Sequence, residues 1–198
     1  LQNEAAFVST EDKIQLIQAL TSSGLSRIEI TSFVHPRWIP ALADADRVAA
    51  AFTSDQATTY TALVPNERGL ERALKTEMSE IAVFMSASET HNLRNINKTR
   101  DDTYLAFEPV FAECAERGIA VRAYLSTVWG CPYEGQVDPG ETAQIARRLL
   151  DMGAYEVSLG DTIGVGNPLQ TCRILESIGA VLPLDKVAMH MHDTRGAA

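Results

Sequence analysis

The stretch that decides the fold is Lys186-Val187-Ala188-Met189-His190-Met191-His192-Asp193-Thr194. Side chains alternate between the two faces of a β-strand, so His190 and His192 should share one face. Val187, Met189 and Met191 then form an apolar face that helices can cover. Two imidazoles on one face can bind the same metal ion, since neutral imidazole is the commonest protein ligand for metals. The alternative is a solvated strand end whose two histidines bind no metal.

The composition is that of an ordinary globular domain. With 198 residues, of which 45% are hydrophobic and 22% charged, the chain can bury one sizeable core. A net charge of -9 argues against a nucleic-acid-binding surface but still allows a local basic pocket for an anionic substrate. No apolar run approaches the roughly 20 residues that span a bilayer, so no membrane association is expected.

Cysteine usage and the first residues bear on the cellular location. Cys114, Cys131 and Cys172 are odd in number and lack the spacing of a disulfide framework or a metal site, which indicates a reducing compartment such as the cytoplasm. The chain starts at Leu1 without a methionine and without the pattern of a signal peptide, so we expect an excerpt from a longer sequence.

Helices and strands are predicted to alternate along the whole chain. The strands are expected at 25–33, 59–64, 81–85, 119–126 and 155–159 and in the histidine stretch. The helices are expected at 9–24, 42–52, around Leu70 and Leu74, and at 100–117, 139–152 and 168–181. Residues 86–99 are predicted to form a long polar loop, in which His91 and the neighbouring asparagines lie on the surface. Strands that alternate with amphipathic helices imply a parallel sheet with right-handed crossovers.

A (β/α)8 TIM barrel fits this alternation better than an open sheet does. Polar residues occur at or just past the carboxyl ends of several strands: Glu29, Thr31, the loop that begins at Ser86, Tyr124, Ser126, Asp161, His190 and His192. That end of a barrel is its active face, whereas an open sheet concentrates such groups at one switch point. Eight strands and about 250 residues are usual for the barrel. We therefore expect residues 1–198 to form a single barrel domain that is incomplete at both ends, with about six of the eight strands.

Five motifs occur in the order in which they occur in one known family. They are Leu1-Gln2-Asn3-Glu4, Ile28-Glu29-Ile30-Thr31-Ser32-Phe33, Gly130-Cys131-Pro132-Tyr133-Glu134-Gly135, Ser158-Leu159-Gly160-Asp161-Thr162-Ile163-Gly164 and His190-Met191-His192-Asp193-Thr194. Together they closely resemble the 3-hydroxy-3-methylglutaryl-CoA lyases, over the whole chain and on strands two to seven of that barrel. The last motif is shared with related metal-dependent barrels, including isopropylmalate and homocitrate synthases.

The resemblance implies a carbon–carbon lyase of leucine catabolism. Its members cleave 3-hydroxy-3-methylglutaryl-CoA (HMG-CoA) to acetyl-CoA and acetoacetate with Mg²⁺ or Mn²⁺. An acyl-CoA substrate, a homodimer, and a cytoplasmic location (the mitochondrial matrix in a eukaryote) are expected on the same basis. Two imidazoles with oxygen ligands suit Mn²⁺ or Zn²⁺ at least as well as Mg²⁺, so the metal is preferred only through the resemblance.

The resemblance also implies roles for individual residues. His190 and His192 match the metal ligands, and His190 is expected to assist proton transfer. Glu29 and Asp161 match acids of the catalytic network. Gln2, Arg122 and Tyr124 match residues close to the substrate or supporting the site.

Other pieces of the family's active site are expected outside this chain. An Arg-Asp pair would precede Leu1, and a catalytic cysteine loop and an asparagine ligand would follow Ala198. The excerpt alone should therefore be inactive. Cys131 also stands in a Gly-Cys-Pro-Tyr sequence, but it follows a different strand, so we do not assign it as the catalytic cysteine. Cys114 and Cys172 are expected to be buried in helices.

Structural roles remain open for the same residues. Glu29 could be a solvated strand residue, Asp161 a helix cap or turn former, and Arg122 and Tyr124 structural side chains. Two other functions also remain open. One is a synthase of the same superfamily, which condenses acetyl-CoA with a 2-oxo acid, and the other is a metal-free barrel module without catalytic activity.

Overall fold

The computed structural model describes residues 1–198 except 3, 54–56, 195 and 197–198. The strands are β1 (Arg27–Ser32), β2 (Thr59–Leu63), β3 (Glu80–Ser86), β4 (Ala120–Ser126), β5 (Glu156–Gly160) and β6 (Val187–His190). Their order in the sheet follows the chain, from β1 to β6. The strands pair in parallel: β1 with β2, β2 with β3, β4 with β5, and β5 with β6. The six predicted strands are confirmed, and the ends of the first five agree within two residues, whereas β6 ends at His190, short of the predicted histidine strand that included His192.

Helices connect the strands, as predicted. The α-helices are α1 (Thr10–Ser22), α2 (Ala45–Ala49), α3 (Glu67–Ala73), α4 (Glu89–Ile96), α5 (Arg100–Arg117), α6 (Pro139–Asp151) and α7 (Pro168–Gly179). Two 3-10 helices, η1 (Pro40–Leu42) and η2 (Leu184–Lys186), complete the described elements. None of the described helices is long and apolar enough to cross a membrane.

The chain divides into two compact units. The first contains Leu1–Val83 and Ala112–Ala120, and the second contains Phe84–Phe111 and Val121–Ala198. Each unit is described by itself below. A single domain over residues 1–198 stays a prediction.

Side-chain caps fix where several helices begin. Ser9 accepts a hydrogen bond from the amide of Asp12 at the start of α1, and Ser88 accepts one from the amide of His91 at the start of α4. Asp138 caps α6 and Asn167 caps α7, each followed by a proline in the first helical position. These side chains satisfy amide groups that the first turn of a helix leaves unpaired, and each cap is worth about 1 kcal/mol.

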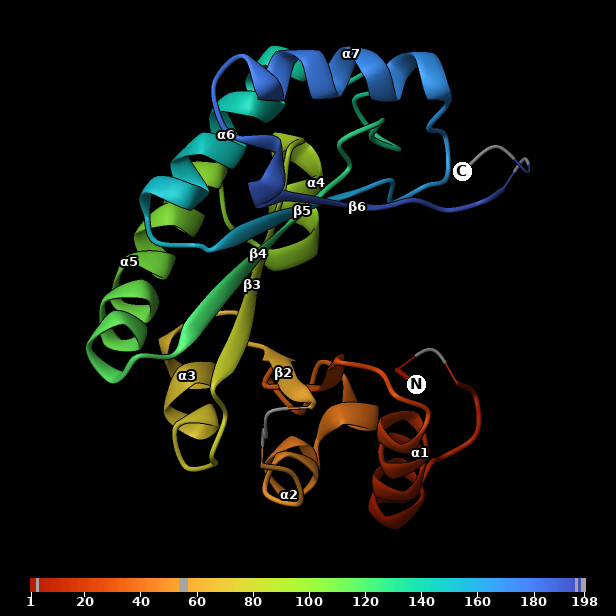
Figure 1. Ribbon diagram of the computed structural model, residues 1–198, viewed down its shortest axis with the longest axis vertical. Coiled ribbons are helices and arrows are strands. Elements are labelled where there is room, and N and C mark those ends of the chain that lie inside the picture. Colours follow the sequence, from red (N-terminus) through yellow and green to blue (C-terminus); the bar gives the residue numbers. More distant parts are fainter. Residues whose placement is uncertain (3, 54–56, 195, 197–198) are drawn as a thin grey trace. The chain divides into compact units, whose positions relative to one another are not determined.

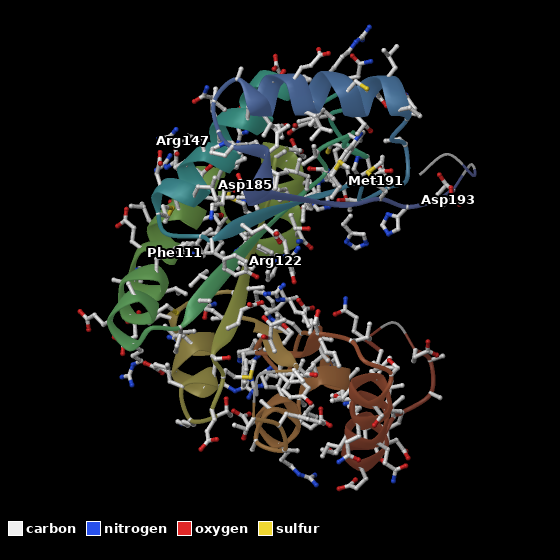
Figure 2. The ribbon with its side chains drawn as sticks, viewed as in Figure 1. Phe111, Arg122, Arg147, Asp185, Met191 and Asp193 are labelled. Atoms are coloured by element: carbon white, nitrogen blue, oxygen red, sulfur yellow. The ribbon has the colours of Figure 1, made fainter. Side chains whose placement is uncertain are left out.

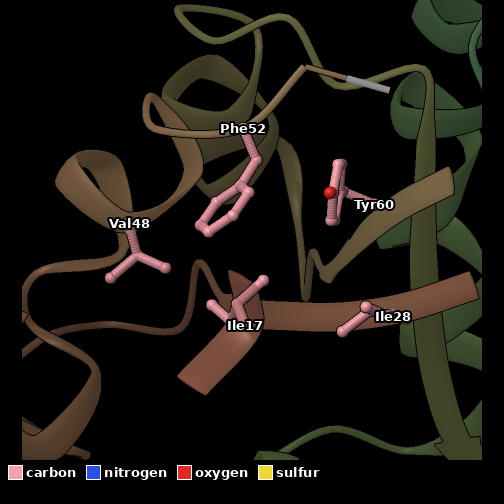
Figure 3. Packing of buried hydrophobic residues seen from close by; sticks show 5 residues of the cluster. All are labelled: Ile17, Ile28, Val48, Phe52 and Tyr60. Carbon is pink, nitrogen blue, oxygen red and sulfur yellow. The ribbon is translucent and has the colours of Figure 1, made fainter. Parts of the chain in front are cut away.

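The core of the first unit lies between its helices and one face of its strands. Ile17 of α1, Ile28 of β1 and Val48 of α2 pack with Phe52 and Tyr60 (Figure 3). The rings of Phe52 and Tyr60 are tilted, with centroids 4.9 Å apart. Because Ile28 is buried in this cluster, its neighbours Arg27 and Glu29 occupy the other face of β1, where both are exposed.

In the second unit the same alternation places polar side chains on one face of β4. Val121, Ala123 and Leu125 are buried, whereas the residues between them are only half-buried. Helices α6 and α7 pack against each other in this unit (Figure 1). The apolar face of β4 is thus part of the core, and Arg122, Tyr124 and Ser126 lie on the opposite face.

The prediction of a loop over 86–99 is wrong, because α4 occupies Glu89–Ile96. Ser88 begins this helix and Asn97, with a left-handed φ of 54°, ends it. Its one fully buried side chain is polar: Asn92 accepts from the Ser86 amide and donates to the Lys98 carbonyl and the Thr103 hydroxyl. The helix was missed because an amide, and not an apolar stripe, fixes it to the rest of the unit.

Two further predictions need correction. The helix expected over 42–52 is shorter, since α2 covers only Ala45–Ala49, and the 3-10 helix η1 precedes it. Asp44 directly precedes α2 with a non-helical backbone, and its carboxylate binds Thr10 and Lys13 of α1. Cys172 is exposed on α7, whereas Cys114 is buried as expected.

Candidate metal and proton-transfer site

The two histidines of the opening motif lie side by side. The ring centroids of His190 and His192 are 5.0 Å apart, with an angle of 54° between the ring planes. His190 is the last residue of β6 and pairs with Gly160 of β5, whereas His192 lies just beyond the strand. Strand alternation therefore places His190, but it does not by itself place His192.

The backbone of Asp161 contacts both histidines. Its amide donates to the carbonyl of His190 over 2.9 Å, and its carbonyl lies 2.6 Å from Nδ1 of His192. Since a carbonyl only accepts, Nδ1 of His192 carries the proton and a neutral ring presents its lone pair at Nε2. A backbone carbonyl on the far nitrogen is a common way to orient a metal-binding histidine.

The carboxylate of Asp161 is buried and is engaged within its own loop. Its two oxygens accept hydrogen bonds from the amides of Val165, over 2.9 Å, and Gly166, over 3.1 Å. The side chain is 1% exposed. Asp161 thus shapes the loop after β5, which corresponds to the turn-forming role left open in the sequence analysis. Its predicted catalytic role stays a prediction.

The glycines of this loop permit close packing against the histidine segment. Gly164 has a φ of +63°, and a Cβ there would stand 2.4 Å from Cγ2 of Thr194. The Thr194 hydroxyl donates to the Gly164 carbonyl over 2.6 Å. A Cβ on Gly166 would come within 2.9 Å of Cε of Met191, a residue labelled in Figure 2. Larger residues would push the histidine segment away from the loop.

The site fits two ligands of a metal ion. Metal–imidazole bonds of about 2.0–2.1 Å require the two ligating nitrogens to lie within about 4 Å of each other. Adjacent rings with centroids 5.0 Å apart are compatible with that requirement. Within the described residues, no group of three or more His, Cys, Asp or Glu side chains could hold a metal. The histidine pair is thus a partial donor set.

Arg122 and Tyr124 meet on the polar face of β4. The Arg122 guanidinium lies 2.6 Å from the Glu156 carboxylate on β5, and its carbon lies 5.3 Å from the centre of the Tyr124 ring. Burial alone would lower the pKa of Arg122, but hydrogen bonds with Glu156 and Tyr124 outweigh it and raise the pKa. Arg122 (labelled in Figure 2) is therefore a fixed cation on this face.

Glu29 and Gln2 belong to the first unit. Glu29 lies on the exposed face of β1, opposite Thr61 of β2 in the parallel register. Gln2 is exposed near the start of the chain. Their predicted roles in catalysis and substrate binding stay predictions.

Polar side chains at the carboxyl ends of β3 and β4 form a network whose contacts the sequence analysis did not predict. The Ser86 hydroxyl lies 2.8 Å from that of Ser126 and 2.5 Å from Nδ1 of His91. Burial lowers the pKa of His91, although the negative charge of Glu134 acts in the opposite direction. The lowered pKa favours a neutral ring. The contacts of Ser86 with Ser126 and His91 were not predicted, because α4 was not recognised and His91 was assigned to a surface loop.

Cys131 is buried in the loop after β4. Its thiol donates to the Ser88 hydroxyl over 2.9 Å, and its backbone pairs with Gly135 in both directions. Tyr133 of the same loop stacks under Arg94, whose guanidinium carbon lies 4.3 Å from the ring centre. These contacts link the loop to α4.

The fold and the site define a class: a protein of alternating parallel strands and helices with a histidine pair at the carboxyl end of β6. A family profile described as HMGL-like matches residues 1–198. The chain therefore belongs to the HMGL-like family, and the resemblance found in the sequence is confirmed.

Individual relatives agree with this assignment. A hydroxymethylglutaryl-CoA lyase of Bacillus subtilis is 50% identical over 198 residues, which are 100% of this chain and 66% of that protein. The crystal structure of the Bacillus subtilis HMG-CoA lyase matches 99% of this chain and 66% of its own with a TM-score of 0.95. An HMG-CoA lyase from Acinetobacter baumannii in complex with coenzyme A and 3-methylmalate is 34% identical, covers 99% of this chain and 64% of its own, and has a TM-score of 0.92.

These matches establish the fold as part of a (β/α)8 barrel, as predicted. The chain spans 64–66% of the length of these three relatives.

Proposed function

We propose that the protein containing this chain is a divalent-metal-dependent lyase that cleaves HMG-CoA to acetyl-CoA and acetoacetate. The observation that carries the proposal is the His190–His192 pair, in which the Asp161 carbonyl holds the second ring in one tautomer. Membership of the HMGL-like family and 50% identity to a hydroxymethylglutaryl-CoA lyase support this reaction.

The reaction is a retro-Claisen cleavage. A base removes the proton of the tertiary hydroxyl, and the bond between that carbon and the methylene beside the thioester breaks. The carbinol carbon becomes the ketone of acetoacetate, and the electron pair passes to the thioester enolate. Protonation of the enolate gives acetyl-CoA. A bound Mg²⁺ or Mn²⁺ would lower the hydroxyl pKa and orient the substrate, which is worth several kcal/mol.

We assign the proposed roles as follows. His190 and His192 hold the metal, and His190 also moves the hydroxyl proton, a contribution of roughly 10²–10⁴-fold. Glu29 and Asp161 complete the catalytic network. Gln2, Arg122 and Tyr124 bind or orient the substrate, and the guanidinium of Arg122 is held in place by Glu156.

The remaining parts of the proposal concern the setting of the enzyme. A homodimer is expected and can be measured by light scattering. A cytoplasmic location, or the mitochondrial matrix in a eukaryote, accords with cysteines that form no disulfide among the described residues.

The proposal is tested by titrating Mn²⁺ into the complete protein by calorimetry and by assaying HMG-CoA cleavage. Replacement of His192 by alanine should remove most metal affinity and nearly all cleavage. Replacement of His35, an exposed histidine far from the motif in sequence, should change neither. Unchanged Mn²⁺ binding in His192→Ala would contradict the proposal. Condensation of acetyl-CoA with a 2-oxo acid, without HMG-CoA cleavage, would instead identify a synthase.

A further inference from the structure

Among the residues that the structure describes, one β-branched residue, Thr127, has a backbone conformation that such residues rarely adopt. It follows β4 directly and has a φ of +62°. Its side chain is fully buried. A positive φ in a β-branched residue is a genuine outlier, and such strain persists only where the surroundings enforce it. Glycine would adopt this conformation without strain, so the threonine side chain must contribute something that glycine lacks.

The contacts of Thr127 join three loops at the carboxyl ends of neighbouring strands. Its hydroxyl accepts from the amide of Ser88, over 3.3 Å, in the loop after β3. The same hydroxyl donates to the carbonyl of Ser126 over 2.6 Å, at the end of β4. Its amide donates to the hydroxyl of Thr162, over 2.7 Å, in the loop after β5. All of these partners belong to the second unit.

The loop after β5 is the one that orients both histidines. Thr162 directly follows Asp161, whose amide binds the His190 carbonyl and whose carbonyl binds His192. The amide of Val128, which directly follows Thr127, donates to the carbonyl of Gly160 over 3.1 Å. The left-handed turn at Thr127 therefore directs two consecutive amides onto the residues on either side of Asp161.

We propose that Thr127 is a positioning residue that holds the Asp161 backbone, and through it the tautomer and orientation of His192, in the metal-binding arrangement. The inference rests on the proposed function. The strained backbone is maintained because the buried hydroxyl anchors the turn to Ser88 while the amide anchors the loop after β5. Residues that orient a metal ligand from behind typically change metal affinity 10–100-fold when replaced.

Three substitutions in the complete protein separate the hydroxyl from the backbone strain. Thr127→Ser keeps the hydroxyl, Thr127→Val keeps the branched shape without it, and Thr127→Gly removes both hydroxyl and strain. Asn97→Gly is the matched control, because Asn97 also has a left-handed φ, of 54°, but is exposed at the end of α4.

Two readouts are measured for each variant. The first is the dissociation constant for Mn²⁺, determined alongside the midpoint of urea unfolding. We expect Thr127→Gly to bind Mn²⁺ about tenfold more weakly while its unfolding midpoint stays near that of the wild type, since strain relief and lost contacts oppose each other. Thr127→Ser, which keeps the hydroxyl, should bind Mn²⁺ as tightly as the wild type, and so should Asn97→Gly.

The second readout is amide hydrogen exchange of residues 161–166 in metal-free protein. Exchange there should accelerate in Thr127→Gly and Thr127→Val and not in Asn97→Gly. Wild-type affinity and unchanged exchange in Thr127→Gly would overturn the inference. If the wild type bound no Mn²⁺, the proposed function would fail, and the exchange measurement would still decide whether Thr127 holds the loop.

Discussion

Nδ1 of His192 lies 2.6 Å from the backbone oxygen of Asp161, so the chain orients this imidazole through its main chain and not through a carboxylate. The Asp161 carboxylate meanwhile accepts the amides of Val165 and Gly166. The residue therefore has two separable parts: a carbonyl that faces His192 and a carboxylate that maintains the loop.

Replacement of Asp161 by asparagine should destabilise the protein and weaken metal binding together. An amide side chain offers one acceptor oxygen where the carboxylate offers two, so one buried backbone amide loses its partner, at a cost of about 1–3 kcal/mol. Urea unfolding and Mn²⁺ titration measure the two effects. If kcat alone fell, with stability and Mn²⁺ affinity unchanged, Asp161 would act directly on the substrate and not through the loop.

We expect the ion pair between Lys13 and Asp44 to make a large and pH-dependent contribution to the free energy of unfolding. Nζ of Lys13 lies 2.8 Å from Oδ1 of Asp44, and these side chains are only 8% and 17% exposed. Asp44→Asn would leave a buried ammonium group without its carboxylate, and we expect a loss of about 3 kcal/mol in the free energy of unfolding. The matched control is the Glu11–Arg47 pair, which links α1 to α2 nearby, with side chains 67% and 68% exposed. Its removal by Glu11→Gln should cost less than about 1 kcal/mol.

The difference between wild type and Asp44→Asn should depend on pH in one direction. Burial alone would raise the pKa of Asp44, but hydrogen bonds from Lys13 and Thr10 outweigh it and hold the pKa below its ordinary value of 3.8. A carboxyl with a lowered pKa in the folded state contributes stability above its unfolded pKa and loses it as the pH falls through the folded value. The difference between the two proteins should be constant from pH 7 to about 5 and should shrink below about pH 4. A difference that grew toward acid would contradict this assignment.

The three cysteines should react at very different rates. Burial, aided by the charge of Glu113, raises the pKa of the Cys114 thiol to about 11, whereas Cys172 is exposed. At pH 8 a thiol with such a pKa is about one part in a thousand thiolate, the reactive form. Alkylation followed by peptide mass spectrometry should label Cys172 first and leave Cys114 and the buried Cys131 unlabelled in folded protein. Urea should make all three reactive, which controls for the reagent. Early labelling of Cys131 would indicate that its loop opens.

Asn92 should be the most sensitive position of α4. Its amide makes three hydrogen bonds, to the Ser86 amide, the Lys98 carbonyl and the Thr103 hydroxyl, and is fully buried. Asn92→Ala leaves those groups unpaired, and we expect a loss of about 2–3 kcal/mol in unfolding free energy. Asn95→Ala, three residues along on the exposed side of the same helix, should change it by less than about 0.5 kcal/mol. Equal effects of the two substitutions would show that α4 is not anchored by Asn92.

Helix α4 and the site together show which features local sequence can predict. The strands were predictable because alternation along β4 and the cluster around Ile28 follow from apolar residues at regular intervals. The histidine pair was predictable because both residues stand in one short motif. Helix α4 was not, since its anchor is a buried amide whose partners lie at residues 86, 98 and 103. The role of the Asp161 carbonyl was also not predictable, because every residue has a main-chain carbonyl and the residue type does not show which one accepts a hydrogen bond. Thr127 was missed for a similar reason, since its φ depends on the loops around it.

Arg122 offers a way to separate support of the fold from a role in the reaction. Its guanidinium is held by Glu156 over 2.6 Å, and the two side chains are 19% and 24% exposed. Arg122→Met alone leaves Glu156 unpaired and should cost about 2–3 kcal/mol in unfolding free energy, whereas the double variant Arg122→Met/Glu156→Leu should recover most of that stability. If Arg122 binds the acyl-CoA, as proposed, the double variant should still show at least a tenfold lower kcat/KM for HMG-CoA, mainly through KM, because uniform binding to substrate and transition state is lost. Recovery of kcat/KM together with stability would assign Arg122 to the fold alone.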